Sequence, residues 1–304
     1  MEIPPVVLGC GNFGGIGSAP AFFGRGETKE QAFALLDAAW EMGLRWFDTA
    51  DAYGGGRSES WIGEWIAATG NRPRITTKTF NPMCEGADSG LAPERVRRQL
   101  ESSLERLGVD SVDLYLAHEP DHATPITDTI GAFEQSVSVD LVGTWGLSNY
   151  GAVELREALA AGRPALLQNS FSLLFRDDEA DVIPACAAEG IAYQCFGPLA
   201  GGWLTGKYRP GASLPEGSRM TMRPEPYAHL DSDAVYRSLD ALAAAAAGRG
   251  VSTAGLALAW LLAHPGVASI VVGPRTPEHL EPVREALAVD LTAQEHEEVG
   301  SLFS

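Results

Sequence analysis

The sequence predicts a (β/α)₈ barrel of the TIM class, formed as one domain by residues 1–304, with long loops on its C-terminal face. The first observation behind this is that short apolar runs alternate with longer amphipathic segments, the pattern of parallel βαβ units. The second is that eight such runs occur, each followed by a helical segment. The third is that no change in composition marks a linker within the 304 residues, a length that suits one barrel.

The eight expected strands are nearly continuous in apolar character, as strands buried on both faces should be. They cover residues 6–10, 44–50, 74–80, 112–119, 141–148, 165–171, 191–197 and 268–273. The expected helices cover residues 28–42, 58–69, 92–107, 128–138, 152–161, 179–189, 231–248, 252–263 and 277–287. The alanine-rich stretch at 240–250 is expected to be helix that stops at a glycine.

Three connections are longer than ordinary loops and cover residues 11–27, 81–91 and 200–230. They follow the first, third and seventh strands. They therefore belong to the C-terminal face, where barrel enzymes carry their active sites.

Composition argues against several classes of function. The chain has 22 Lys and Arg against 40 Asp and Glu, a net charge of −18, and such a surface repels nucleic acid and anionic lipid. No apolar run reaches the roughly 18 residues that cross a bilayer, and the N-terminal segment shows no export signal. The four cysteines, at positions 10, 84, 186 and 195, lack disulfide or metal spacing, so we expect reduced thiols in a cytoplasmic protein.

Residues 9–14 match the GxGxxG fingerprint of dinucleotide-binding folds. That fingerprint also requires a helix opening within the motif and an acidic residue about 20 positions on. Here glycines and prolines continue through Pro20, and the expected helix begins only near Thr28, with Asp37 in its middle. We therefore reject an open Rossmann sheet and expect these glycines to let the loop approach a ligand closely.

Polar side chains stand at the ends of three consecutive predicted strands. Asp48 and Lys78 lie within apolar runs, His118 ends the fourth strand, and Tyr53 follows Asp48 by five residues. A buried Asp or Lys is unfavourable unless paired, so we expect Asp48 to neutralise Lys78. Each residue could be structural when taken alone, but their common position on one rim favours a catalytic group of four. The sequence offers no His/Cys cluster to hold a metal.

An ordered series of motifs is more specific than any one of them. The motifs are FDTADAYG at 47–54, TTK at 76–78, HEPD at 118–121, GLSNY at 146–150, QNSFSLL at 168–174, PLAGGWLTGKY at 198–208 and GPRTPEHL at 273–280. On these motifs the chain resembles the aldo-keto reductase family over nearly its whole length. It is more similar to the bacterial, short-tailed branches, because only 17 residues follow Leu287. The resemblance implies NADPH-dependent reduction of an aldehyde or ketone to an alcohol.

The resemblance assigns Tyr53 as the general acid that gives a proton to the carbonyl oxygen while NADPH gives a hydride to the carbon. A lysine cation about 4 Å from the phenol should favour the phenolate by about 4 kcal/mol, less the opposing effect of burial. We therefore expect a lowered pKa for Tyr53. The same scheme has Asp48 keep Lys78 charged and has His118 orient the carbonyl with a hydrogen bond.

The resemblance also assigns the cofactor contacts. It places Asn149 and Gln168 at the nicotinamide carboxamide, beside Ser148, and Phe196 against the nicotinamide ring. The expected pyrophosphate contacts follow the seventh strand and are Leu199, Gly201, Leu204 and Lys207. Arg275 is expected at the adenosine 2′-phosphate, in the segment that also holds Gly273 and His279.

Two positions depart from the family pattern. His279 and Val283 stand where relatives commonly carry Gln and Asn, so the usual adenine contacts are partly missing; NADPH is favoured, and NADH stays open. The small carbonyl substrate is expected to meet an aromatic rim suited to aryl or alkyl groups. Its members are Phe22, Phe23, Phe80, the 81–91 loop, Trp203 and Tyr227, with Arg219 and Arg223 available for an anionic group.

Three other functions stay open. A cofactor-binding regulatory subunit with little turnover, as among the potassium-channel β subunits that resemble these enzymes, would need a partner-binding segment, and none is evident. An NADH-preferring alcohol or sugar dehydrogenase would use the same barrel, whereas a lyase or isomerase would bind no nicotinamide cofactor. The sequence does not indicate an oligomeric state.

Overall fold

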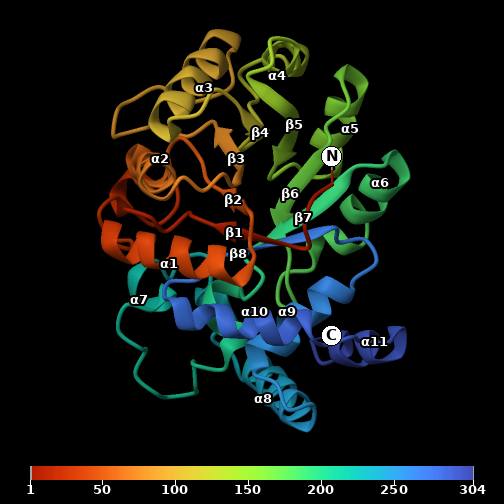
Figure 1. The fold of residues 1–304 in the computed structure, drawn as a ribbon. Helices are drawn as coiled ribbons and strands as arrows, with labels where there is room; N and C mark the ends of the chain where they lie inside the picture. The colour runs from red at the N-terminus through yellow and green to blue at the C-terminus, as the bar shows by residue number, and fades with distance from the viewer. Residues whose placement is uncertain (1, 304) are drawn as a thin grey trace.

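Eight parallel strands close into a barrel in the computed structural model of the protein, which describes residues 2–303 (Figure 1). Neighbours in the sequence are neighbours in the sheet, and β8 pairs with β1 to complete the circle. The strands are β1 (Val6–Gly9), β2 (Trp46–Asp48), β3 (Arg74–Thr79), β4 (Val112–Ala117), β5 (Val142–Ser148), β6 (Leu166–Ser170), β7 (Ala192–Phe196) and β8 (Ser269–Val272). Each lies inside a predicted run, so the predicted fold class is confirmed.

Helices surround the strands (Figure 1). They are α1 (Lys29–Met42), α2 (Arg57–Thr69), α3 (Pro93–Leu107), α4 (Ile126–Ser138), α5 (Ala152–Ala161), α6 (Val182–Glu189), α8 (Asp233–Gly248), α9 (Thr253–Ala263) and α10 (Glu281–Leu287). Two predicted helices are shorter than expected because each opens as a 3₁₀ turn. The turn η3 (Asp177–Glu179) precedes α6, and η6 (Pro277–Leu280) precedes α10.

The chain ends in a helix that the sequence analysis did not predict, α11 (Ala293–Ser301). It begins with a capping box, in which the Thr292 hydroxyl accepts from the Glu295 amide and the Glu295 carboxylate accepts from the Thr292 amide. The helix packs on α9, where Trp260 Nε1 donates to the carbonyl of His296. The predicted 200–230 loop likewise contains short helical turns, namely η4 (Ala200–Thr205), α7 (Arg219–Met222) and η5 (Ala228–Leu230).

Two apolar clusters divide the core. The larger one lies between the strands and the helices, while a smaller one is formed by alternate strand residues: Val7, Trp46, Leu114, Leu116, Leu166 and Val271. Side chains alternate between the two faces of a strand, so the smaller set fills the barrel interior. Asp48 and Lys78 share this inward face, because they follow Trp46 and Thr76 by two residues and Trp46 Nε1 donates to Thr76 Oγ1 across the strands at 2.8 Å.

Among residues 2–303, no single helix is long and apolar enough to span a membrane. The helices α8 and α9 reach that length and composition only as a pair, across a bend of 88°.

Candidate active site

The four residues predicted at the strand ends meet at the C-terminal end of the barrel. Asp48 ends β2, Lys78 lies one residue from the end of β3, His118 follows β4, and Tyr53 opens the turn η2 (Tyr53–Gly56). Tyr53 Oη lies 3.4 Å from Lys78 Nζ and 3.5 Å from His118 Nε2. Three strands therefore bring one phenol, one ammonium and one imidazole into contact.

Lys78 is paired as the sequence predicted. Its side chain is fully buried, and its ammonium lies 2.5 Å from Asp48 Oδ1 and 2.9 Å from the carbonyl of Thr49. Burial opposes the charged form, but Asp48 and then Tyr53 raise the pKa of Lys78 above its ordinary value. Lys78 is thus an ammonium at neutral pH.

The second oxygen of Asp48 joins a polar layer across the barrel interior. Gln168 Nε2 on β6 donates to Asp48 Oδ2 at 2.8 Å and to Gln194 Oε1 on β7 at 2.7 Å. Gln194 Nε2 in turn donates to Ser269 Oγ on β8 at 3.1 Å. The carboxylate that holds Lys78 is therefore fixed from the opposite wall of the barrel.

The pKa of Tyr53 differs from the prediction. Burial raises the pKa of the phenol above its ordinary value, and Lys78 offsets only part of this effect while Asp48 adds to it. The predicted lowering is therefore wrong for this arrangement, because the Lys78 charge is already shared with Asp48 and the hydroxyl lies deep among its partners. Tyr53 is a protonated phenol at neutral pH.

His118 is held in its neutral form. Burial, and then the nearby Lys78 charge, keep its pKa well below the ordinary value. Asn81 Nδ2 donates to Glu119 Oε1 at 3.3 Å, which orients the amide, and lies 3.5 Å from His118 Nδ1. An amide nitrogen is a donor, so this arrangement suits a ring whose proton is on Nε2. That N–H points to the side where Tyr53 lies and is available to a carbonyl oxygen there.

The residues expected at the nicotinamide lie beside this group. Asn149 has a left-handed backbone, with φ of 61°, and its Nδ2 donates to the His118 carbonyl at 2.9 Å and to Ser148 Oγ at 3.3 Å. Because both N–H groups of Asn149 and both of Gln168 are used within the protein, only their amide oxygens remain for a cofactor. Phe196 is half-buried at the end of β7 and packs against the inner cluster.

Three cations gather on the other side of the site. Arg275 Nε lies 2.5 Å from Glu27 Oε1, Arg219 Nη2 donates to Asn12 Oδ1 at 2.7 Å, and Lys207 is exposed. Burial, and then Arg275 and Arg219, lower the pKa of Lys207. Burial raises the pKa of Glu27, although Arg275 opposes this. One carboxylate among three cations leaves an excess of positive charge, in a chain whose net charge is −18.

The other predicted cofactor residues surround these cations. Gly201 has φ of 65°, and a Cβ there would stand 2.7 Å from the Tyr227 ring, so that ring covers it. Gly273 is exposed, and His279 Nδ1 accepts from the Arg275 amide at 3.2 Å. Leu199 is half-buried, whereas the Leu204 side chain is fully buried in the core, so Leu204 can contribute only its backbone to a cofactor site.

The predicted aromatic rim is present in part. Phe22, Phe23, Phe80 and Tyr227 are half-buried on the C-terminal face. Trp203 is not part of the rim, because it is 1% exposed and packs on Tyr208 and Tyr236 with ring centroids 4.9 and 5.8 Å away. The Arg223 guanidinium lies over the Phe22 ring at 5.2 Å, which links the 200–230 segment to the first loop.

The glycines of the first loop pack mainly on protein rather than on an open ligand space. A Cβ on Gly15 would stand 2.8 Å from Gly54 Cα in the turn η2. A Cβ on Gly54 itself, whose φ is 60°, would stand 2.4 Å from the Phe13 carbonyl in the first loop. A Cβ on Gly11 would meet the Tyr53 ring at 3.4 Å. These glycines therefore let the first loop support Tyr53.

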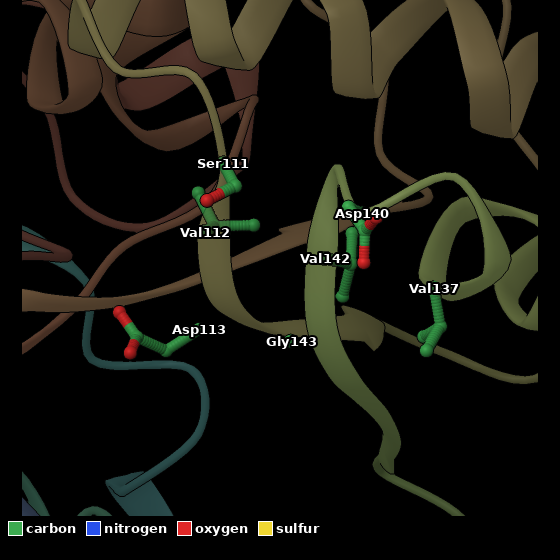
Figure 2. Close-up of a pocket in the computed structure, with 7 residues that line it drawn as sticks. All are labelled: Ser111, Val112, Asp113, Val137, Asp140, Val142 and Gly143. Atoms are coloured by element: carbon green, nitrogen blue, oxygen red, sulfur yellow. The ribbon is translucent and has the colours of Figure 1, made fainter.

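A separate hollow of about 240 Å³ lies at the opposite end of the barrel, between the starts of β4 and β5 (Figure 2). It is lined by Ser111, Val112, Asp113, Val137, Asp140, Val142 and Gly143. The Asp113 carboxylate accepts from the Ile75 amide and serves the fold. This end of a barrel is associated with stability, and we assign no function to the hollow.

Several residues of the site were missed by the sequence analysis. Asn81 lies beside His118 Nδ1, Gln194 extends the polar layer, and Glu27 accompanies Arg275. Gln194 had a signal, since it is a polar residue on the inward face of an apolar strand. Glu27 had none, because its partner is 248 positions away.

Comparison with known proteins agrees with this geometry. Residues 5–303 match the sequence model described as the aldo/keto reductase family. The uncharacterized oxidoreductase YrpG of Bacillus subtilis is 33% identical over 288 residues, 88% of this chain and 86% of the relative. A probable voltage-gated potassium channel subunit beta of Oryza sativa is 31% identical over 281 residues, 88% of this chain and 85% of the relative. The aldo-keto reductase yakc [NADP(+)] of Schizosaccharomyces pombe is 31% identical over 279 residues, 88% and 81% of the two chains.

A solved structure supports the fold. That of a glycerol dehydrogenase from Gluconobacter oxydans superposes with a TM-score of 0.84 over 98% of this chain and 90% of that chain. The two sequences are 24% identical, so this likeness concerns the barrel and not the substrate.

Proposed function

Because the chain belongs to the aldo/keto reductase family, we propose that it reduces a small aldehyde or ketone to an alcohol with NADPH as the reductant. The observation that carries the proposal is the contact of Tyr53 Oη with both Lys78 Nζ, at 3.4 Å, and His118 Nε2, at 3.5 Å. A proton donor, a cation that stabilises its conjugate base and a neutral hydrogen-bond donor are then close enough together to act on one carbonyl oxygen.

The protein's own groups have separate tasks in this reaction. The His118 Nε2–H donates a hydrogen bond that orients and polarises the carbonyl oxygen. Tyr53 transfers its phenolic proton to that oxygen, and Lys78 stabilises the phenolate that remains. Asp48, held by Gln168, keeps Lys78 charged and in place. A raised phenol pKa makes the Lys78 contact more important, because the negative charge on Tyr53 is otherwise unfavourable in a buried site.

NADPH, when bound, supplies a hydride to the carbonyl carbon. The residues present fit this cofactor, since Lys207, Arg219 and Arg275 form a cationic patch with one carboxylate among them. Such a patch suits a pyrophosphate and a 2′-phosphate. The name of the relative from Schizosaccharomyces pombe also includes NADP(+). His279 and Val283 are present in place of the usual adenine contacts, so we propose that phosphate recognition dominates the binding of NADPH.

The decisive experiment follows the absorbance of NADPH at 340 nm with a panel of aryl and alkyl aldehydes and ketones, and repeats each reaction with NADH. Carbonyl-dependent oxidation that is faster with NADPH at low cofactor concentration supports the proposal. Tight NADPH binding without turnover on any member of the panel contradicts it.

A regulatory role is the second candidate, since some relatives are named as potassium channel β subunits. Such a protein also binds a nicotinamide cofactor on this barrel but turns over slowly. The complete group of Asp48, Tyr53, Lys78 and His118 favours the enzyme, and the same assay separates the two functions.

A further inference from the structure

A chain of hydrogen-bonded, buried polar side chains, separate from the polar layer inside the barrel, runs along the outer face of β3, between the barrel and α2 and α3. Thr79 Oγ1 donates to Asp51 Oδ2 at 2.6 Å and accepts from Arg95 Nη1 at 2.8 Å. Arg95 Nη2 donates to the Asn81 carbonyl at 2.8 Å, and Asn81 Nδ2 lies 3.5 Å from His118 Nδ1. This hydrogen-bond chain therefore begins at Asp51, two residues before Tyr53, and ends at the His118 ring.

The direction of these hydrogen bonds depends on the charge of Asp51. The Thr79 hydroxyl has one proton, which it gives to Asp51 Oδ2 while its lone pair accepts from Arg95. The other carboxylate oxygen, Oδ1, already accepts from the Ala52 amide at 2.6 Å. If Asp51 gains a proton on Oδ2, it becomes a donor to Thr79, and the Thr79 proton loses its acceptor.

Arg95 fixes the loop that follows β3. The residue is 3% exposed, and besides Asn81 its guanidinium donates to the carbonyls of Gly90 and Asp88. Besides Asp51, the carboxylate near Arg95 is that of the exposed Asp88, whose Oδ1 is 3.6 Å from Arg95 Nε. Asp51 is thus the buried negative charge that faces a buried guanidinium, and losing it weakens the anchor of Asn81.

Asp51 changes charge within the ordinary working range of an enzyme. Burial raises its pKa to about 7, with Glu59 adding to the rise while the Thr79 hydrogen bond and Arg95 oppose it. The other groups around it are Tyr115 on β4 and Arg106 on α3, which holds Glu59. Lys78 presents only its main-chain carbonyl to the Asp51 amide, at 3.0 Å, because its ammonium lies inside the barrel with Asp48.

We propose that Asp51 is a positioning residue whose negative charge, acting through Thr79, Arg95 and Asn81, holds the His118 imidazole in the orientation that meets a substrate carbonyl. This inference rests on the proposed function, since His118 affects turnover only if it touches that carbonyl. Above neutrality Asp51 is ionised and the chain is intact; as the pH falls and Asp51 gains a proton, the anchor of Asn81 loosens and His118 loses its support.

The test compares Asp51→Asn with Glu59→Gln. Glu59 is an equally buried carboxylate in the same region, but it pairs with Thr77 and Arg106 and lies outside the chain to His118. In the unmodified protein kcat/KM should rise about ten-fold between pH 6 and pH 8, with a midpoint near 7. Asp51→Asn should remove this inflection and keep kcat/KM at the low level. Glu59→Gln should retain the inflection but move its midpoint to lower pH, because Glu59 adds to the rise of the Asp51 pKa.

A second readout does not need turnover. The ¹⁵N resonances of the His118 ring, assigned with His118→Asn, should shift with a midpoint near 7 in the unmodified protein. The shift should persist in Glu59→Gln with a lower midpoint, because Glu59 adds to the rise of the Asp51 pKa, and it should be absent in Asp51→Asn. His118 itself stays neutral in this range. A His118 shift in a protein that reduces no carbonyl would reject the proposed function and leave the coupling standing. An inflection near pH 7 that persists in Asp51→Asn, in either readout, overturns the proposal.

Variants of Thr79 test the proposal independently if Asp51→Asn does not fold. Thr79→Ser keeps the hydroxyl and should keep the pH-dependent His118 shift, whereas Thr79→Val removes the hydroxyl and should abolish it. Equal shifts in the two variants would overturn the proposal as well.

Discussion

The two halves of the site hold their charges differently. Around Tyr53 the one ammonium, Lys78, has no exposed side-chain surface and sits 2.5 Å from a carboxylate that is itself 4% exposed. Around the expected phosphate site, Glu27 pairs with only one of three cations, Arg275, whose side chain is 37% exposed. The first half is neutral as a unit and built on strand ends, whereas the second is positive and built on loops.

This difference teaches which half does which work. A set of residues that is enclosed and neutral as a whole can keep its reactive arrangement without a ligand, because every charge in it already has a partner. An open group with excess positive charge is unfavourable by itself and is stabilised when an anion arrives. The strand half is therefore suited to proton transfer and the loop half to binding a phosphate-bearing cofactor, and the variants below should affect one property without the other.

The largest effect is expected for Tyr53→Phe, which removes only the proton donor. Carbonyl reduction should fall by up to roughly 10⁴-fold, while NADPH affinity, measured by fluorescence titration, stays the same. Tyr150→Phe is the matched control, because Tyr150 is 1% exposed and its hydroxyl has no hydrogen-bond partner among the described residues. Normal turnover in Tyr53→Phe would end the assignment of this residue as the acid.

Lys78→Met tests whether the charges of Asp48 and Lys78 must neutralise each other for the protein to be stable. It leaves Asp48 as a buried, unpaired charge, so the free energy of unfolding in urea should fall by roughly 3–5 kcal/mol. Adding Asp48→Asn should restore most of the stability without restoring activity. If Lys78→Met unfolds at the same urea concentration as the unmodified protein, the pair is not the balanced unit described above.

In the loop half, the double variant Glu27→Gln/Arg275→Leu removes the ion pair while leaving no unpaired charge. Losing the guanidinium should weaken NADPH binding about 10- to 100-fold and change NADH binding less than about two-fold. Glu27→Gln alone should bind NADPH at least as tightly as the unmodified protein, since Arg275 is then free of its carboxylate. Equal losses for both cofactors would place Arg275 away from the 2′-phosphate.

The smallest effect is expected from Lys207→Met, which should weaken NADPH binding about five-fold at pH 7. The pKa of Lys207 is lowered, so the ammonium is present below that pKa and is lost as the pH rises through it. NADPH affinity should therefore decline as the pH rises through this lowered pKa in the unmodified protein, and more weakly in Lys207→Met. Identical pH dependence in both would mean that Lys207 makes no phosphate contact.

Some features that were missed had a signal in the sequence. The Thr292–Glu295 capping box is a sequence signal for the start of α11, but no helix was predicted there because the last segment has a weak apolar pattern. Arg95 falls on the buried face of α3 together with Val96 and Leu100, and a cation on such a face requires a partner. The buried carboxylate nearby is Asp51, which lies in the same motif as Tyr53 and is joined to Arg95 through the Thr79 hydroxyl, but nothing local in the sequence indicates this link.

Other features had no local signal at all. Gln168 meets Asp48 across 120 positions, and Arg275 meets Glu27 across 248. Trp203 is an aromatic residue on a loop, and only the packing of that loop on Tyr208 and Tyr236 decides that it is buried.

Apolar periodicity in the sequence is enough to predict the barrel and the positions of Asp48, Lys78 and His118, because it defines each strand and parallel strands all end on one face. Folding is needed to show that Gln168 holds Asp48, that Glu27 accompanies Arg275, and that burial outweighs Lys78 in setting the pKa of Tyr53. The physical reason is that periodicity is a local property of the chain. Desolvation and long-range pairing depend instead on how completely distant segments enclose each group.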